Sequence, residues 1–299
     1  HVHYAIPHSV SALLARQMLA ANGRSLPFIT TLHGTDITLV GLDHSYWPIT
    51  RFGIVESDGV TAISSHLRDR TREAFGVTSE IEVIQNFVNC DVYTRNPELV
   101  AAMRPRFAAA DERLLVHLSN FRPVKRILDV VQVFARVAAA IPARLMLIGD
   151  GPDRSAAEHL ALQLKVQDRI HFVGKQDNVN ELLPLADLML MPSEMESFGL
   201  AALEAMACSV PSIATRVGGV PELINDGQVG EEPNGLLFEV GDISAMSEAA
   251  ISLLRDDSRL AAMSKAARKT AQDHFCASRI IPQYESYYER VIARSRSAS

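Results

Sequence analysis

The sequence predicts an α/β fold made of two doubly wound parallel sheets, and three observations carry this prediction. Short apolar or β-branched runs alternate with segments of helical periodicity, as in sheets whose parallel strands are joined by helices. Runs such as 145–148 are apolar at every position, which is typical of strands covered on both faces. The length of 299 residues is sufficient for two domains of ordinary size.

Short runs along the chain have the length and composition of strands, and helical periodicity fills most of the intervals. The expected strands are 1–4, 27–32, 58–63, 81–84, 113–118, 144–148, 169–173, 187–191, 211–215 and 235–240. The expected helices are 8–21, 64–75, 123–140, 153–165, 178–185, 198–208, 243–255, 258–274 and 278–293. In open α/β sheets ligands bind beyond the carboxyl ends of the strands, so polar residues that follow a strand are the candidates for a site.

One segment interrupts the alternation and divides the chain. Residues 85–112 are rich in asparagine, proline and charged residues, as linkers often are. We therefore expect a first Rossmann-like domain over 1–112, a second over 113–276, and a C-terminal helix over 277–299 that packs back on the first. The chain opens directly in strand-like residues without an initiator methionine, so we expect the first domain to be incomplete at its N-terminus.

The bulk composition argues against several classes of protein. The formal net charge of −6 does not suggest a nucleic-acid partner. Cys90, Cys208 and Cys276 are scattered without a C-x-x-C pair, which argues for a reducing compartment and against a disulfide framework or a thiolate zinc site. With no apolar run long enough to span a membrane and no signal peptide in the sequence, we expect a cytoplasmic protein without a transmembrane segment.

Two glutamates, Glu196 and Glu204, bracket the start of a helix rich in small residues. An apolar strand precedes them, so Glu196 lies in a strand-to-helix loop and Glu204 within the helix. The amides of Phe198, Gly199 and Leu200 would be free at the helix N-terminus, where anions bind. This arrangement suits a nucleotide-sugar. One carboxylate could contact the sugar, the free amides could bind its phosphates, and the second carboxylate could reach the ribose. An amphipathic helix with solvated glutamates would show the same spacing.

Two cations, Arg122 and Lys125, follow the strand 113–118 at the start of the next expected helix. The helix dipole disfavours cations at this end unless an anion is present. A bound phosphate would offset this unfavourable interaction with the helix dipole. The alternative interpretation is that the two cations form a solvated basic patch.

Two glycine-containing turns also follow strands. Turn 149–152 either shapes a pocket wall or is a tight turn alone, and turn 218–222 is more typical of a structural role. The sequence contains no G-x-x-x-x-G-K-[ST], G-x-S-x-G or H-E-x-x-H motif, so P-loop, serine-hydrolase and zincin chemistry are unsupported.

The histidines of the first half are a further candidate group. His33 follows the strand 27–32, and we expect it to hydrogen-bond a ligand, with a satisfied core histidine as the alternative. His1, His3 and His8 could join it as metal ligands. No carboxylate flanks residues 1–8, so we expect no metal.

Taken together, these motifs resemble the family 4 retaining glycosyltransferases of GT-B fold. The resemblance covers nearly the whole chain and depends on a specific combination of segments. They are 3–8, 32–38, 51–52, 119–126, 149–152, 196–207 and 218–222.

The resemblance implies a retaining enzyme that transfers N-acetylglucosamine from UDP-N-acetylglucosamine to L-malate, the first step of bacillithiol biosynthesis. It implies small-molecule substrates, and neither a metal nor another cofactor. The alternatives are a relative with a lipid or sugar-phosphate acceptor, and a non-catalytic binder of nucleotide-sugars. A homo-oligomer is left open.

Residue roles are carried over from the family to the matching positions. Contact with the transferred sugar is assigned to His33 and Glu196, and contact with the ribose of UDP to Glu204. The groups assigned to the diphosphate are Arg122, Lys125 and the amides of Phe198, Gly199 and Leu200. The candidates for the malate pocket in the first domain are Tyr4, Thr31 and Arg51. Arg51 suits a dicarboxylate because its planar guanidinium pairs a carboxylate through two hydrogen bonds.

The sequence departs from the family pattern at three places. In the family, a strand and a glycine-rich loop precede the position where this chain starts. Ser119 and Asn120 stand where Gly-Arg is usual, and Arg122 is the candidate to replace that arginine. Loop 226–235 is longer than usual and has no functional interpretation.

Overall fold

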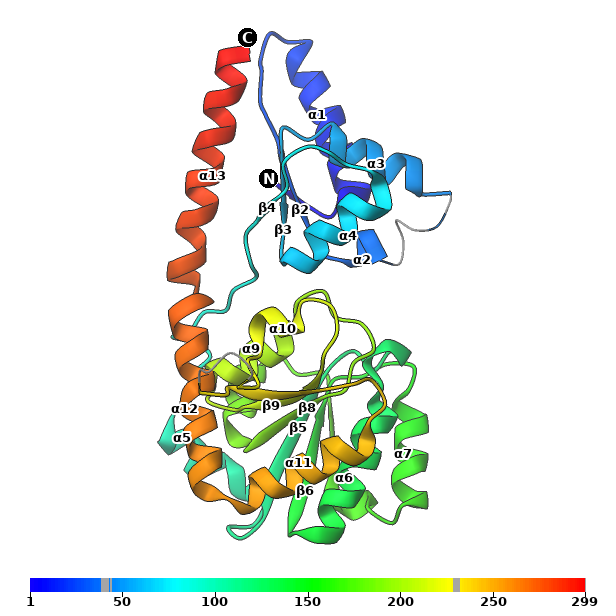
Figure 1. Cartoon of the computed structure of the whole chain (residues 1–299), viewed down its shortest axis with the longest axis vertical. Helices are drawn as coiled ribbons and strands as arrows, with labels where there is room; N and C mark the ends of the chain where they lie inside the picture. Colours follow the sequence, from blue (N-terminus) through cyan, green and yellow to red (C-terminus); the bar gives the residue numbers. More distant parts are fainter. Residues whose placement is uncertain (39–42, 44, 228–231, 299) are drawn as a thin grey trace. The chain divides into compact units, whose positions relative to one another are not determined.

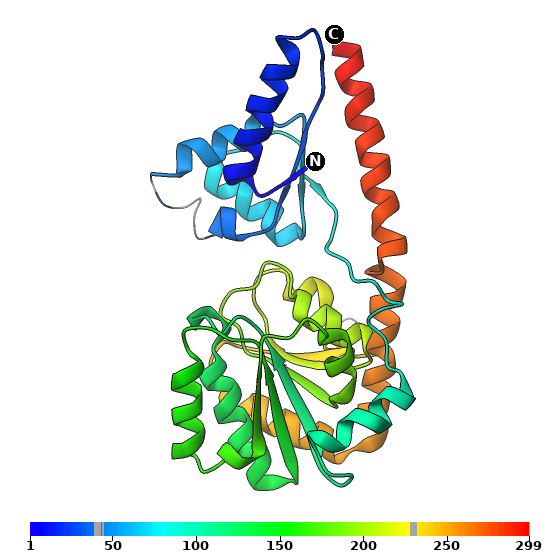
Figure 2. The same cartoon turned by 180° about the vertical axis from the view of Figure 1, so that it is seen from behind.

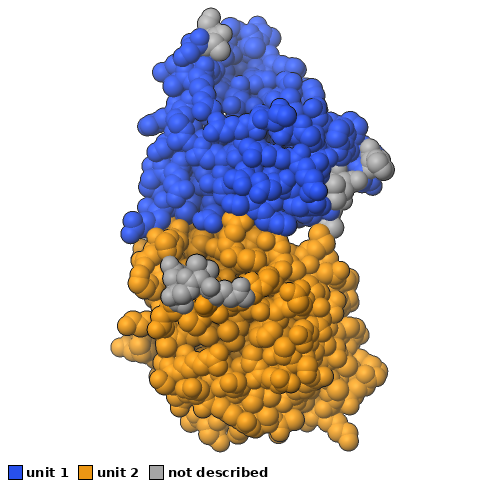
Figure 3. Space-filling model, in the orientation of Figure 1, with its two compact units in different colours: residues 1–86, 277–299 blue, residues 87–276 orange. Residues whose placement is uncertain are grey.

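The computed structural model describes residues 1–38, 43, 45–227 and 232–298. It divides into unit 1, residues 1–86 and 277–299, and unit 2, residues 87–276 (Figure 3). The sequence places the boundary at 112, but the structure places it at 86/87. The reason is an ion pair within unit 2, in which the Arg104 guanidinium lies 2.7 Å from the Asp187 carboxylate and anchors the preceding segment.

Unit 2 contains a parallel sheet of six strands with the order β10-β9-β8-β5-β6-β7. The strands are β5 (Arg113–Leu118), β6 (Ala143–Ile148), β7 (Ile170–Gly174), β8 (Leu188–Met191), β9 (Ser212–Thr215) and β10 (Gly235–Phe238). The order reverses between β5 and β8, which is the doubly wound arrangement with its switch point at that place. This sheet confirms the predicted fold class.

Helices cover both faces of this sheet (Figure 1, Figure 2). They are α5 (Pro97–Met103), α6 (Ile127–Ala140), α7 (Arg154–Gln163), α8 (Val179–Leu182), α9 (Leu200–Ala207), α10 (Val220–Leu223), α11 (Ile243–Arg255) and α12 (Asp257–His274). Helices α6, α7 and α11 bury their apolar sides in the main core with β5, β6 and β8, and α9 packs against α12. Short 3₁₀ turns are η2 (Arg104–Arg106), η3 (Pro123–Lys125), η4 (Gln167–Arg169) and η5 (Leu183–Leu185).

Unit 1 contains a smaller parallel sheet with the order β1-β2-β3-β4. Its strands are β1 (Val2–His3), β2 (Ile29–Leu32), β3 (Gly59–Ala62) and β4 (Glu82–Val83). Its helices are η1 (Ala5–Ser9), α1 (Val10–Ala20), α2 (Thr35–Thr38), α3 (Trp47–Val55), α4 (Ser65–Phe75) and α13 (Ala277–Ala298). The long C-terminal helix α13 packs on the sheet through Ile280, Tyr287 and Val291, which share a core with Ile29 and Ile84.

Three expectations need correction or comment. The single helix expected over 123–140 is two elements, because Arg126 adopts φ 50° between η3 and α6. The helix α3 was not expected from the sequence. Of loop 226–235, residues 228–231 lie outside the described part of the chain.

The expectation of unpaired cysteines is wrong for two of the three. Cys90 and Cys276 form a disulfide with their Cα atoms 5.6 Å apart, while Cys208 is free and buried. The two partners are 186 residues apart in the sequence, and spacing alone gives no sign of a pair that only the fold brings together. Across the described residues, none of the helices is long and apolar enough to cross a membrane.

Candidate functional site

The turns that follow β5, β6, β8 and β9 pack against one another at the carboxyl edge of the unit 2 sheet. A Cβ atom added to Gly149 would lie 1.8 Å from the Ser119 carbonyl oxygen, and one added to Gly151 would lie 2.0 Å from that of Asn120. These glycines are therefore required by the close approach of the β6 turn to the β5 turn. The sequence motifs of this half thus meet at the switch point, where open α/β sheets bind ligands.

Lys125 and Glu196 are brought together from the turns on either side of the switch point. The Lys125 ammonium lies 2.5 Å from the Glu196 carboxylate, and their side chains are 23% and 13% exposed. The Glu194 amide donates to the Val124 carbonyl at 2.8 Å and joins the same two turns through the backbone. A partly buried cation is thereby held beside a partly buried carboxylate.

The loop that carries Glu196 is fixed on its other side by the β9 turn. The Gly219 amide donates to the Glu196 carbonyl at 3.2 Å, and a Cβ on Gly218 would lie 1.6 Å from the same oxygen. The Ser193 hydroxyl donates to the Glu196 carboxylate at 3.0 Å, and Thr215 donates to the Ser193 carbonyl. The loop is therefore held by its neighbours before any ligand binds.

The start of α9 has the features expected of an anion site. Gly199 lies at φ 97° and precedes the first residue of the helix, which has no side-chain cap. Phe198 is buried and fixes the entry to the helix, whereas Leu200 is exposed. Uncapped amides at a helix N-terminus favour a negative charge. The structure thus places Phe198, Gly199 and Leu200 next to the loop that carries Glu196.

Glu204 is half-buried one turn further along α9. Burial raises the pKa of its carboxyl to about 7, although a hydrogen bond from the Tyr93 hydroxyl acts in the opposite direction. Tyr93 is a contact that the sequence reasoning missed, since it lies far from Glu204 along the chain. Arg122 is exposed at the start of η3. Its carbonyl accepts a hydrogen bond from the Lys125 amide at 2.8 Å, but no described contact joins its guanidinium to Lys125 or Glu196.

His117 is a second residue that the sequence reasoning missed. It is fully buried on β5, where burial lowers its pKa to about 4, so the ring is neutral at pH 7. Its Nδ1 lies 2.8 Å from the Leu190 carbonyl and its Nε2 lies 2.8 Å from the Ser119 hydroxyl. Because a carbonyl only accepts, Nδ1 carries the proton and Nε2 accepts from Ser119. The ring therefore links the β5 turn to β8.

In unit 1, three predicted residues lie together at the ends of β1 and β2. The Tyr4 and His33 rings have centroids 4.9 Å apart, and the Tyr4 amide donates to the Thr31 carbonyl at 2.8 Å. Tyr4 has φ 72°, a conformation that costs a non-glycine residue free energy and recurs at ligand sites. The Thr31 hydroxyl is buried between His1 and Thr61 at 2.7 and 2.6 Å, so its described partners are protein groups.

His33 is neutral in this environment. Burial, and then the charge of His3, lower its pKa to about 4. Its Nε2 shares a hydrogen bond of 2.8 Å with Nδ1 of His3. The sequence is compatible with a buried His1–His3 pair, but both of these side chains are exposed.

Arg51 and His8 are the remaining unit 1 residues that the sequence suggests for a ligand or metal site. The Arg51 Nε–H donates to the Phe75 carbonyl at 3.0 Å, which orients the guanidinium, and no described contact joins Arg51 to Tyr4 or Thr31. His8 donates from Nδ1 to the His3 carbonyl at 2.6 Å, and its ring centroid lies 6.3 Å from that of Tyr4. In the described part of the chain, no group of three or more histidines, cysteines or carboxylates is arranged to hold a metal ion.

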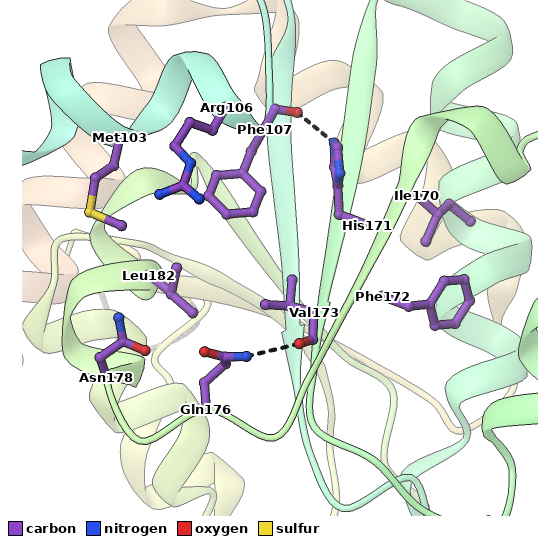
Figure 4. Close-up of a pocket in the computed structure, with 10 residues that line it drawn as sticks. All are labelled: Met103, Arg106, Phe107, Ile170, His171, Phe172, Val173, Gln176, Asn178 and Leu182. Atoms are coloured by element: carbon purple, nitrogen blue, oxygen red, sulfur yellow. Dashed lines mark hydrogen bonds between the residues drawn. The ribbon is translucent and has the colours of Figure 1, made fainter.

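A cavity of about 620 Å³ elsewhere in unit 2 is not this site. It lies between η2 and the edge strand β7, and contains none of the predicted residues (Figure 4). Its polar contacts are internal, with His171 bonded to the Phe107 carbonyl and Gln176 to the Val173 carbonyl, both at 2.9 Å. These bonds engage the His171 ring and the Gln176 amide within the protein.

Comparison with known families identifies the class to which this fold and these motifs belong. The model for "Glycosyl transferases group 1" matches residues 101–270, and the model for "Glycosyltransferase Family 4" matches residues 1–92. The chain therefore belongs to this family of glycosyltransferases and is an enzyme of GT-B fold.

Individual relatives narrow the comparison. The N-acetyl-alpha-D-glucosaminyl L-malate synthase of Bacillus anthracis is 45% identical over 292 residues, which cover 98% of this chain and 74% of the relative. A GDP-mannose-dependent phosphatidylinositol monomannoside mannosyltransferase of Mycolicibacterium smegmatis is 30% identical over 269 residues, covering 86% and 68%. The crystal structure of Anabaena HepE with UDP and glucose superposes with a TM-score of 0.82 at 19% identity, covering 94% of this chain and 76% of HepE. This last likeness concerns the fold alone.

Proposed function

We propose that the chain transfers N-acetylglucosamine from UDP-N-acetylglucosamine to the hydroxyl of L-malate, with retention of the α configuration and without a metal. This would be the first step of bacillithiol biosynthesis. The single observation that carries the proposal is the Lys125–Glu196 pair at the switch point, beside the uncapped start of α9. The relative from B. anthracis, whose printed name describes this reaction, supports the choice of substrates.

The donor half of the reaction is assigned to unit 2. As the bond between the anomeric carbon and the phosphate oxygen breaks, negative charge grows on the diphosphate. Lys125, Arg122 and the α9 amides would stabilise that charge, since fixed donors aimed at developing charge contribute most to such catalysis. Glu196 would contact the sugar and Glu204 the ribose. A bound phosphate also explains why a lysine is held at the start of a helix.

The acceptor half is assigned to unit 1. The malate hydroxyl oxygen forms the new bond to the anomeric carbon, and its proton passes to the phosphate oxygen that leaves with UDP. Because the leaving phosphate accepts the malate proton, the reaction requires no basic side chain of the protein. His33 is neutral and would hydrogen-bond the sugar. Tyr4, with Thr31 beneath it, and Arg51 would bind the two carboxylates of malate.

The first prediction is that the protein releases UDP from UDP-N-acetylglucosamine only when L-malate is present. A coupled UDP assay with and without malate, followed by mass spectrometry of the product, measures this. Malate-independent release would indicate hydrolysis or another acceptor and would contradict the proposed acceptor. UDP binding without any release would leave the nucleotide site supported and the transfer reaction unsupported.

The second prediction is that Arg51→Ala raises the KM for malate about 10- to 100-fold, because a charge-assisted hydrogen bond contributes about 1.5–3 kcal/mol. The KM for the donor should change far less. Steady-state kinetics with each substrate varied in turn gives both constants. Arg70→Ala is the matched control, since the described contact of the Arg70 guanidinium is an exposed ion pair with Glu73. A larger effect on the donor KM would remove Arg51 from the acceptor pocket.

A further inference from the structure

Two residues of the proposed site in unit 1, Tyr4 and His33, lie in the turns that follow β1 and β2. Their ring centroids are 4.9 Å apart. The backbone of Tyr4 is held on one side, because its amide donates to the Thr31 carbonyl at 2.8 Å. The peptide groups that follow Tyr4 and His33 are both held by a single side chain of α2.

This side chain is Asp36, whose residue is only 2% exposed. Its Oδ2 accepts from the Ala5 amide at 2.8 Å, and its Oδ1 accepts from the Gly34 amide at 2.9 Å. These amides belong to the peptide groups directly after Tyr4 and His33. One buried carboxylate therefore joins two turns that come from different strands.

The two hydrogen bonds offset part of the cost of burying Asp36. Burial raises the pKa of the Asp36 carboxyl, whereas the bonds from the Ala5 and Gly34 amides act in the opposite direction. Tyr4 has φ 72°, an unfavourable conformation that persists only where neighbouring groups fix it. The Thr31 carbonyl and the Asp36 carboxylate hold the peptide groups on either side of Tyr4.

We infer that Asp36 is a positioning residue, whose carboxylate keeps Tyr4 and His33 at the separation that the acceptor and the transferred sugar require. This role depends on the functions proposed for Tyr4 and His33. Asp36 acts through their backbones and not on the reacting atoms. Small displacements of groups that orient substrates lower the rate strongly. Loss of the link should therefore impair transfer to malate and leave the nucleotide site of unit 2 intact.

Asp36→Asn tests this role with little change in the shape of the side chain. An asparagine can accept from only one of the two amides, and its own amino group would face the other, so the link between the turns is lost. We expect kcat/KM for L-malate to fall about 100-fold, partly through a higher KM for malate. The Kd for UDP, measured by calorimetric titration, should remain that of the wild type.

Asp58→Asn is the matched control. The Asp58 carboxylate also accepts from a backbone amide of unit 1, that of Phe28, at 2.8 Å. Phe28 and Asp58 precede β2 and β3, so this bond lies at the opposite edge of the same parallel sheet. The control should keep the wild-type KM for malate. A smaller fraction of folded enzyme would lower kcat without changing KM, which separates instability from mispositioning.

A double-mutant cycle with His33→Ala decides whether Asp36 acts through His33. If it does, adding Asp36→Asn to His33→Ala should lower kcat/KM much less than adding it to the wild type. If Asp36→Asn does not fold, Asp36→Ser takes its place, since serine removes the link without bringing two donors together. Additive losses, or a wild-type KM for malate in the folded variant, would overturn the inference. A wild-type protein without malate-dependent transfer would instead overturn the proposed function.

Discussion

Lys125→Met is expected to lower kcat about 10²- to 10³-fold, the effect seen when one preorganised donor to a developing charge is removed. Methionine keeps the length of the side chain and removes its charge. The Lys125 ammonium is one of the groups assigned to the leaving diphosphate, and it is held in a half-buried position by Glu196 at 2.5 Å. An electrostatic contact is stronger at such a place than in bulk water. Single-turnover kinetics with saturating donor measures the chemical step.

Two further variants separate the charge of Lys125 from its packing. Lys125→Arg retains the charge and should recover part of the lost rate. Lys265→Met makes the same chemical change at an exposed position of α12 and should leave kcat unaltered. A folded Lys125→Met variant with wild-type kcat would remove this residue from the diphosphate site. Thermal unfolding of each variant checks that it is folded.

Gly218→Ala is expected to destabilise unit 2 by at least about 2 kcal/mol and to abolish most of the activity, because the new methyl group has no space. Its Cβ would lie 1.6 Å from the Glu196 carbonyl oxygen, which is a backbone atom. The Glu196 loop would have to move away from the β9 turn and would take the carboxylate with it. Calorimetric melting measures the stability, and UDP release measures the activity.

Gly76→Ala is a closely matched control for this substitution. Gly76 has φ +58°, against +56° for Gly218, and a Cβ on Gly76 would meet no atom within 4 Å. The two substitutions therefore share the cost of a left-handed alanine, about 1–2 kcal/mol, and only Gly218→Ala adds a collision. Equal losses of stability and activity in the two variants would contradict the role assigned to the Gly218 contact.

Most of the fold could be predicted because parallel sheets bury both faces of their strands. The continuous apolar runs at β6 and β8 are direct signs of this burial. Short elements were harder to predict from the sequence. Helix α3, for example, contains a proline and a glycine among large apolar residues, so its sequence shows no clear helical periodicity. The boundary at 86/87 could not be predicted from composition, which shows only that residues 85–112 differ from their surroundings. The ion pair of Arg104 with Asp187 attaches this segment to unit 2.

Some residues of the candidate site could be predicted from the sequence, and others could not. Glu196, Lys125 and the start of α9 could be placed near one another in advance, because each follows a strand of one sheet and the carboxyl ends of those strands share an edge. Tyr93, Arg268 and the Cys90–Cys276 disulfide could not, since they come from segments that meet only in the folded unit. Nothing in the local pattern around Tyr93 distinguishes it from any other tyrosine.

The sequence by itself determined the alternation of strands and helices, the position of each polar motif after a strand, and the family to which the chain belongs. These properties are local, since they depend on periodicity and on short motifs. The tertiary structure alone decided which side chains touch, from the Lys125–Glu196 pair to the bonds of His117 with Leu190 and Ser119. Such contacts depend on the order of strands in the sheet and on long-range packing, which no short stretch of sequence encodes.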